Sequence, residues 1–233
     1  MRTYDFNKGN TITSNYTLSD YFSTIYTKMF IGLIITALVS YMLPLALPGL
    51  FVAIVHNYKI LAILSLFVEL GVIFYIAKAM KDNTKNLTPW FYFYSFVNGI
   101  TMSVILAFSN PVTVATTFLI TAVLFGILAF IGRTTKKDLS GIGKFAIATL
   151  LGLIFATLVN IFLQNTILDY IITYLGVIIF SALIAYDNQK IQKGFSRVTE
   201  ENYNNVTTWH ALDLYLDFIN LFLYILRIMG KNK

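Results

Sequence analysis

The sequence has no cysteine and little charge. Of its 233 residues only 12% are charged, about half the share of about 25% found in a soluble globular domain. The lack of cysteine excludes a disulfide scaffold, a thiol nucleophile and a cysteine-ligated metal. The two histidines, His56 and His210, are too few for a histidine metal site. So little charge cannot cover a water-facing surface, which excludes a soluble enzyme, a nucleic-acid-binding protein and a disordered chain.

The chain is apolar over most of its length, with 57% hydrophobic residues and a mean hydropathy of +0.71. The formal net charge is +6, and in so apolar a chain basic residues are expected beside membrane spans. Residues 1–24 form a polar, cytosolic tail that lacks the apolar core of a removable signal peptide. We therefore expect an integral membrane protein whose partner is the lipid bilayer and not nucleic acid.

Seven apolar stretches are long enough to cross a membrane. A helix needs about 20 residues to span a hydrocarbon core of about 30 Å, and these stretches do not alternate as the strands of a β-barrel would. We predict an all-α, polytopic bundle of seven transmembrane helices over residues 25–229, followed by a short tail at 230–233. The predicted spans are 25–47, 59–80, 88–109, 111–132, 141–163, 168–188 and 207–229.

The distribution of Lys and Arg predicts the orientation. With the N-terminus in the cytosol, thirteen basic residues lie on the cytosolic side and four outside, which is the bias expected of a membrane protein. Three of those four are Arg227, Lys231 and Lys233, so a re-entrant last span remains an alternative. We expect a bacterial plasma membrane protein with its N-terminus in the cytosol and its C-terminus outside.

Four acidic residues, Glu69, Asp187, Asp213 and Asp217, lie inside or at the edge of predicted spans. An ionised side chain at mid-bilayer costs about 2.5–3.5 kcal/mol on insertion scales, and such residues usually mark ion or proton pathways. No Lys or Arg lies deep in a predicted span to neutralise them. Purely acidic charge within the membrane suits a cation or a proton and argues against an anionic substrate.

The last span carries a polar stripe. Asp213, Asp217, Asn220 and Tyr224 are spaced four, three and four residues apart, which places them on one helical face. One interpretation is a packing seam in which neutral acids and amides hydrogen-bond a neighbouring helix. One asparagine would be enough for such a packing contact, so the presence of two carboxylates favours a titrating or ion-handling role. For Asp187 the alternative is an interfacial carboxylate at a helix end.

Two segments carry a resemblance to a known family. Residues 185–191 read AYDNQKI and residues 211–222 read ALDLYLDFINLF. The chain resembles the Bax inhibitor-1 family over about residues 20–230. The resemblance rests on these two motifs, on their order along the chain and on the seven predicted spans. The resemblance implies a pH-sensitive calcium leak without a cofactor, in which Asp187 and Asp217 form a di-aspartyl unit. It also places Glu69 on the ion pathway and matches Asp213 to an extra aspartate of the family.

The chain departs from the family pattern at the basic residue that ends the second span. The resemblance implies an arginine latch for the di-aspartyl unit, whereas here only Lys78 and Lys81 are available. A lysine is a point charge and does not clamp two carboxylates as a guanidinium does. Lys78 and Lys81 are therefore the candidate latch.

Two close carboxylates cannot both ionise cheaply, so they share a proton. We expect the shared-proton state to bridge spans 6 and 7 and to favour one conformation. By depth in the membrane Asp187 matches Asp213 better than Asp217, so pairing with Asp217 requires span 6 to continue past Asp187. Asp213, Asp217 and Asn220 with carbonyls and water would give calcium a weak site and not a tight one.

Two other functions remain open. An intramembrane aspartyl protease also uses two membrane aspartates, and Tyr186-Asp187 resembles half of its signature, but Asp217 follows Leu214-Tyr215-Leu216 where a Gly-x-Gly is needed. A non-transporting regulator that binds other membrane proteins is the second alternative. We expect no enzymatic activity, and the sequence does not separate a channel from a proton-coupled exchanger.

Overall fold

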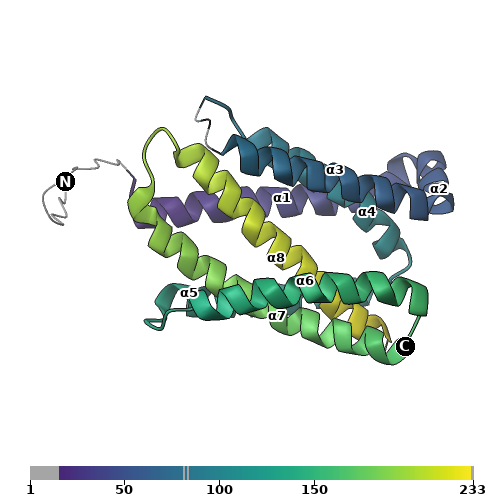
Figure 1. Cartoon of the computed structure of the whole chain (residues 1–233). Coiled ribbons are helices and arrows are strands. Elements are labelled where there is room, and N and C mark those ends of the chain that lie inside the picture. Colours follow the sequence, from purple (N-terminus) through teal and green to yellow (C-terminus); the bar gives the residue numbers. More distant parts are fainter. Residues whose placement is uncertain (1–15, 81, 83, 232–233) are drawn as a thin grey trace, which may run out of the picture.

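The computed structural model describes residues 16–80, 82 and 84–231 and is all-α (Figure 1). Seven long helices and one short helix follow one another along the chain. They are α1 (Leu18–Ala46), α2 (Pro48–His56), α3 (Tyr58–Ala79), α4 (Thr88–Ala107), α5 (Pro111–Thr134), α6 (Ser140–Leu163), α7 (Thr166–Gly194) and α8 (Tyr203–Lys231), with a 3-10 turn, η1 (Phe195–Arg197), before α8. The polytopic seven-helix bundle predicted from the sequence is therefore present.

The helix boundaries differ from the predicted spans at three places. Helix α1 begins at Leu18, ahead of predicted residue 25, because Thr17 and Asp20 form a capping box that satisfies the first backbone N–H groups. Pro48 starts the additional short helix α2 after the first span. Helix α7 continues to Gly194, six residues past the predicted end of span 6. Most of the predicted N-terminal tail lies outside the described residues.

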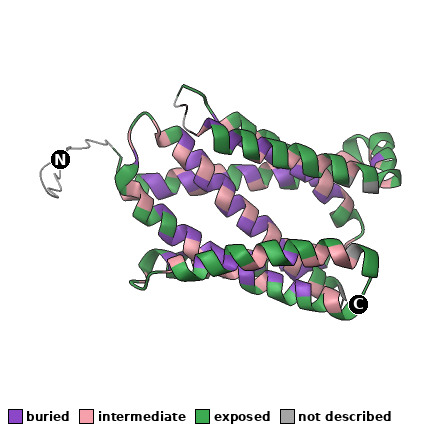
Figure 2. Ribbon diagram, in the orientation of Figure 1, coloured by how far each residue is buried: buried purple, intermediate pink, exposed green. Residues whose placement is uncertain are grey.

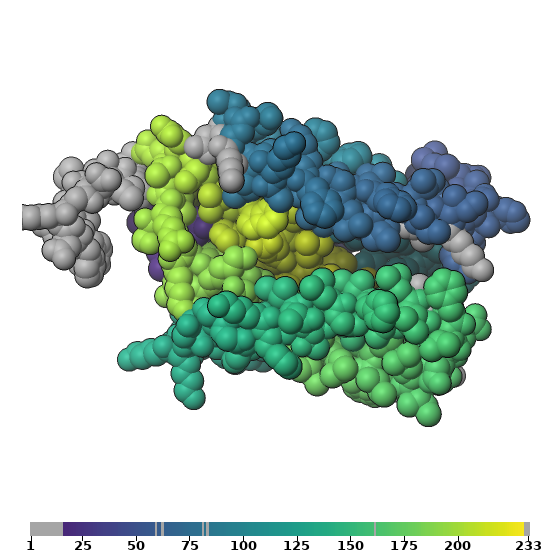
Figure 3. All heavy atoms as spheres, viewed as in Figure 1, coloured from purple at the N-terminus to yellow at the C-terminus, as the bar shows by residue number. Residues whose placement is uncertain are grey.

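Helix α8 lies at the centre of the bundle, in contact with α1, α4, α5 and α7, whereas α3 packs mainly on α4 and α6 on α7. Figure 2 shows buried residues along the whole of α8 and on the inner faces of its neighbours. In Figure 3 α8 is visible between α3 and α6. A helix covered by protein on most sides can carry polar residues that lipid would not accept, which explains the polar stripe.

The outer helices turn apolar side chains away from the bundle. Phe74 of α3, Phe155 and Phe162 of α6 and Phe130 of α5 are all exposed. Among the described residues, α1, α4, α5, α6 and α7 are each long and apolar enough to cross a membrane. Helices α3 and α8 run alongside them for the length of the bundle (Figure 1). An exposed apolar belt of this kind is the surface expected against lipid.

Helix α8 is one continuous helix of 29 residues. It starts at the end of the bundle where α1 begins and finishes at the opposite end (Figure 1). A re-entrant last span would need a break in this helix, and between Tyr203 and Lys231 there is none. The end of α8 therefore lies at the end of the bundle opposite to the start of α1.

Glycines let the helices around α7 approach one another closely. A Cβ atom at Gly132 of α5 would overlap the backbone carbonyl of Ala185 on α7. A Cβ atom at Gly143 of α6 would overlap the ring of Tyr186. Small residues at helix interfaces allow this contact in membrane proteins, and here they fix α7 between α5, α6 and α8.

Candidate functional site: an aspartate cluster between α7 and α8

The cluster depends on the extension of α7 past Asp187. The next two residues, Asn188 and Gln189, are polar but buried by neighbouring segments. Asn188 accepts a hydrogen bond from the Tyr26 hydroxyl at 2.5 Å. The Gln189 side chain bonds the backbone of the α5–α6 loop, donating to the Lys137 carbonyl and accepting from Leu139 N–H, both at 2.8 Å. These contacts keep α7 helical and hold Asp187 against α8.

Asp187 of α7 and Asp217 of α8 lie within hydrogen-bonding reach of each other. Both are buried, with 9% and 4% of their surface exposed. A carboxylate only accepts hydrogen bonds, so one of the two carboxyls must carry a proton for the bond to form. The structure thus joins the two residues that the resemblance pairs, and the extension of α7 removes the mismatch in depth.

Asp213 joins the same cluster through a lysine. The Lys190 ammonium lies 3.3 Å from Oδ1 of Asp187 and 3.2 Å from Oδ2 of Asp213, one on each helix. No Lys or Arg was predicted deep in a span, and Lys190, at the partly exposed end of α7, nevertheless pairs with both carboxylates. Lys190 follows Asp187 by three residues, one helical turn, and was placed outside the span only because the predicted helix ended too early.

The predicted latch lysines do not take this position. Lys78 is exposed on α3 and makes no ion pair with a carboxylate among the residues that the structure describes. Lys81 lies outside the described residues. Lys190 supplies the cation of the cluster, and the assignment of the latch to Lys78 is corrected accordingly.

His210 is a member of the cluster that sequence reasoning missed. Its Nδ1 atom lies 3.6 Å from Oδ2 of Asp213, and the residue is buried. The spacing in the sequence could have indicated this contact, since His210 and Asp213 are three residues apart and therefore lie on the same face of α8. The ring stands at the edge of the cluster on the side where α8 begins.

The cluster has three carboxyl groups against one ammonium, and its polar groups are incompletely satisfied. Apart from the Asp187 carboxyl, no described group donates a hydrogen bond to the buried Oδ2 of Asp217. Buried polar atoms of this kind are rare in folded proteins and call for an explanation. Such a site is suited to bind a proton or a cation, because either would compensate the excess negative charge.

Asn220 does not contribute to the cluster through its amide nitrogen. That group donates to the Leu216 carbonyl of its own helix at 2.8 Å. Among the described residues no group of three or more His, Asp or Glu side chains is arranged to hold a metal ion. The weak calcium site expected at Asp213 and Asp217 stays a prediction.

Glu69 belongs to a second polar network on the other side of α8. Its Oε2 accepts a hydrogen bond from Tyr94 of α4 at 3.3 Å, while Oε1 is buried without a partner. The ring of Tyr94 contacts the ring of Tyr215 on α8 with centroids 5.9 Å apart. The Tyr215 hydroxyl bonds Thr36 at 2.6 Å and donates to Asn98 at 3.2 Å. The predicted pathway residues therefore lie in two groups.

Comparison with known proteins agrees with this architecture. Residues 18–233 match the family model described as inhibitor of apoptosis-promoting Bax1. The chain belongs to the Bax inhibitor-1 family. An uncharacterized membrane protein of Streptococcus pyogenes serotype M1 is 35% identical over 215 residues, which cover 92% of this chain and 94% of the relative. The inner membrane protein YbhL of Escherichia coli K12 is 33% identical over 220 residues, 93% of each chain.

The family and these relatives establish the class of protein. The chain is an integral membrane protein of the Bax inhibitor-1 family, and its bacterial relatives include an inner membrane protein. The match covers all of the described helices, including both groups of polar residues around α8.

Proposed function

We propose that the protein is a pH-sensitive leak for cations, calcium foremost, across a bacterial plasma membrane, with its N-terminus in the cytosol and its C-terminus outside. The observation that carries the proposal is the meeting of the Asp187 and Asp217 carboxyls between α7 and α8, inside the bundle. Neither an enzymatic activity nor a cofactor is part of the proposal.

Protonation of this pair would act as the switch. A proton shared by Asp187 and Asp217 links α7 to α8. Loss of that proton places two negative charges side by side at a buried site, which favours separation of the two helices or entry of a cation. Lys190 limits the repulsion, because its ammonium contacts Asp187 and Asp213 at once. The pH therefore shifts the population between a linked and a separated arrangement.

The oxygen-rich cluster suits transit of calcium and not its storage. Calcium takes six to eight oxygen ligands, and Asp213 and Asp217 supply only part of such a set, with water and carbonyls providing the rest. Weak binding allows an ion to leave again, as conduction requires. Glu69, with one buried oxygen free of hydrogen bonds, would be a second station for the ion.

Calcium flux into proteoliposomes at pH 6, 7 and 8 tests the proposal. We expect a flux whose pH dependence is flattened in Asp217→Asn, because an amide does not titrate. Asp138→Asn is the matched control, since Asp138 lies in the exposed α5–α6 loop and pairs with Lys193, and it should keep the wild-type profile. No flux above that of empty liposomes at any pH would overturn the proposal and favour a non-transporting membrane regulator.

A further inference from the structure

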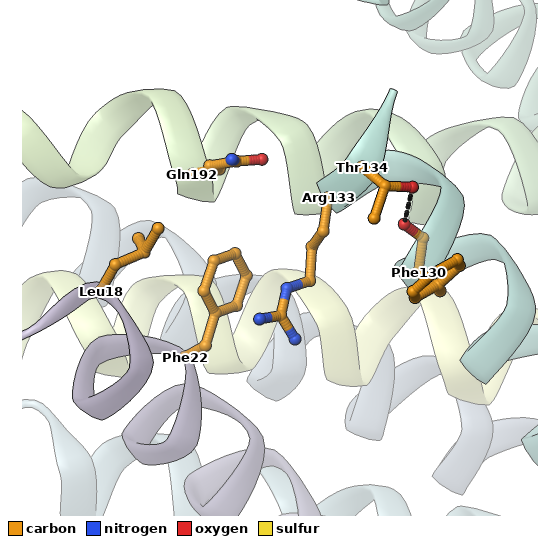
Figure 4. A pocket seen from close by; sticks show the side chains of 6 residues that line it. All are labelled: Leu18, Phe22, Phe130, Arg133, Thr134 and Gln192. Atoms are coloured by element: carbon orange, nitrogen blue, oxygen red, sulfur yellow. Dashed lines mark hydrogen bonds between the residues drawn. The ribbon is translucent and has the colours of Figure 1, made fainter. Parts of the chain in front are cut away.

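A pocket of about 260 Å³ opens between α1, α5 and α7, at the end of the bundle where α1 begins (Figure 4). It lies apart from the aspartate cluster and plays no part in the proposed leak. One wall is aromatic and aliphatic and the other is polar. The lining residues are Leu18, Phe22, Phe130, Arg133, Thr134 and Gln192.

Arg133 is the charged group of this pocket. Its guanidinium carbon lies 4.1 Å from the centroid of the Phe22 ring, so one face of the cation is covered by an aromatic ring. Among the described residues Arg133 forms no ion pair with a carboxylate. Its planar N–H donors match the spacing of phosphate or carboxylate oxygens.

The charges around the pocket also favour an anion. Lys136 and Lys137 follow Arg133 in the loop after α5. The one acidic residue of that loop, Asp138, pairs with Lys193 of α7 at 2.5 Å. Arg133 therefore stands in a locally positive environment, and its guanidinium has N–H donors beyond the one that faces the Tyr26 hydroxyl.

The position of the pocket along the helices indicates the source of the anion. Leu18 is the first residue of α1, and Arg133 is the second last of α5. Because α1 and α5 are long and apolar enough to cross a membrane, residues at their ends are expected near the level of the lipid headgroups. Phe130, one turn deeper on α5, is 67% exposed and continues the pocket wall toward the lipid. A basic pocket between transmembrane helices at this level is a typical site for lipid headgroups.

We propose that this pocket binds the phosphate of an anionic phospholipid. The Arg133 guanidinium holds the phosphate oxygens, Gln192 borders the headgroup, and the glycerol and upper acyl chain lie along Leu18 and Phe130. Thr134 is not a ligand in this arrangement, since its hydroxyl donates to the Phe130 carbonyl at 2.8 Å (Figure 4). The site would tie α1, α5 and α7 to one lipid in the leaflet at this end of the bundle.

Native mass spectrometry of the full chain in detergent, titrated with phosphatidylglycerol or phosphatidylcholine, tests the site. We expect one phosphatidylglycerol molecule to bind preferentially, with affinity lowered on the order of tenfold in Arg133→Gln. Arg133→Lys should retain an intermediate affinity, because charge remains but the fork is lost. Lys136→Gln is the matched comparison, because it removes a charge at the same end of the bundle outside the pocket lining, and it should lose much less affinity than Arg133→Gln. Far-UV circular dichroism checks that each variant is folded.

Three results would overturn the proposal. Equal losses in Arg133→Gln and Lys136→Gln would show diffuse attraction to the basic surface. Equal affinity for the two lipids in the wild type would show that the anionic headgroup is not selected. If inorganic phosphate displaced phosphatidylglycerol at similar concentration, the ligand would be a free phosphate and not a lipid.

Discussion

The Lys190 ammonium on α7 lies 3.2 Å from the Asp213 carboxylate on α8. The same ammonium contacts Asp187 one turn earlier on its own helix at 3.3 Å. One cation thus sits between two of the three carboxyls of the cluster and links the two helices that carry them. In the proposed leak, this lysine sets how strongly the carboxylates repel when they ionise.

Replacement of Lys190 by methionine should move the pH dependence of calcium flux. Without the neighbouring cation the carboxylates hold protons more readily, so the midpoint of the flux profile is expected at a higher pH. Lys193→Met is the matched control, because Lys193 lies on the same helix and pairs with the exposed Asp138. An unchanged midpoint in Lys190→Met proteoliposomes would mean that the ion pair has no part in gating.

Gly132→Ala should destabilise the protein, whereas Gly126→Ala on the same helix should not. A Cβ at Gly132 meets the Ala185 backbone on α7, while a Cβ at Gly126 meets nothing within 4 Å. Overpacking of this kind costs about 1–3 kcal/mol, and a free helical position gains slightly from alanine. Thermal unfolding in detergent measures both variants. Equal melting temperatures would show that α5 and α7 do not pack as closely as described.

Lys28→Met should loosen the contact between α1 and the start of α8. The Lys28 ammonium donates to the side-chain and backbone oxygens of Asn204 and to the hydroxyls of Thr207 and Thr208, all within 3.0 Å. Loss of a charged donor from such a set costs about 1–3 kcal/mol, which lowers the melting temperature by several degrees. The exposed Lys144→Met is the control. Faster hydrogen exchange at the first turns of α8 would accompany the loss, and unaltered exchange would count against the clamp.

Removal of Lys193 should change the titration of Asp138. The hydrogen bond from the Lys193 ammonium, with help from Ser140, lowers the pKa of Asp138 to about 2 from an ordinary value of 3.8. Because the folded pKa is depressed, this contact stabilises the fold above pH 3.8 and the contribution is lost as the pH falls toward 2. In Lys193→Met, carbon-13 NMR should show the pKa of Asp138 raised toward its ordinary value, with the hydrogen bonds from Ser140 retaining part of the shift. A value still near 2 would assign the shift to Ser140 alone.

The helices and the membrane carboxylates could be predicted from sequence because both are local signals. Apolar stretches of about 20 residues bounded by proline or glycine give the spans. Asp217 stands out against its apolar neighbours without any knowledge of the fold. The family motifs around residues 185–191 and 211–222 then indicate which carboxyls meet, and the structure brings Asp187 and Asp217 together.

The end of α7 and the partner of the carboxylates could not be predicted in the same way. Asn188 and Gln189 look like residues that end a span, yet they are buried by Tyr26 of α1 and by the backbone of the α5–α6 loop. These contacts join positions 50 or more residues apart, which hydropathy does not detect. The short prediction for α7 left Lys190 outside the span, while the family resemblance directed the candidate latch to Lys78 and Lys81 at the end of the second span.

Calcium flux through Asp187→Asn, Asp217→Asn and the double variant tests the central claim most directly. If the two carboxyls share one proton, they act as a unit and their effects are not additive. Each single variant should then show the same flattened flux profile between pH 6 and 8 as the double variant. A double variant that keeps the wild-type pH dependence would contradict the account, and so would single variants whose separate effects add up in the double.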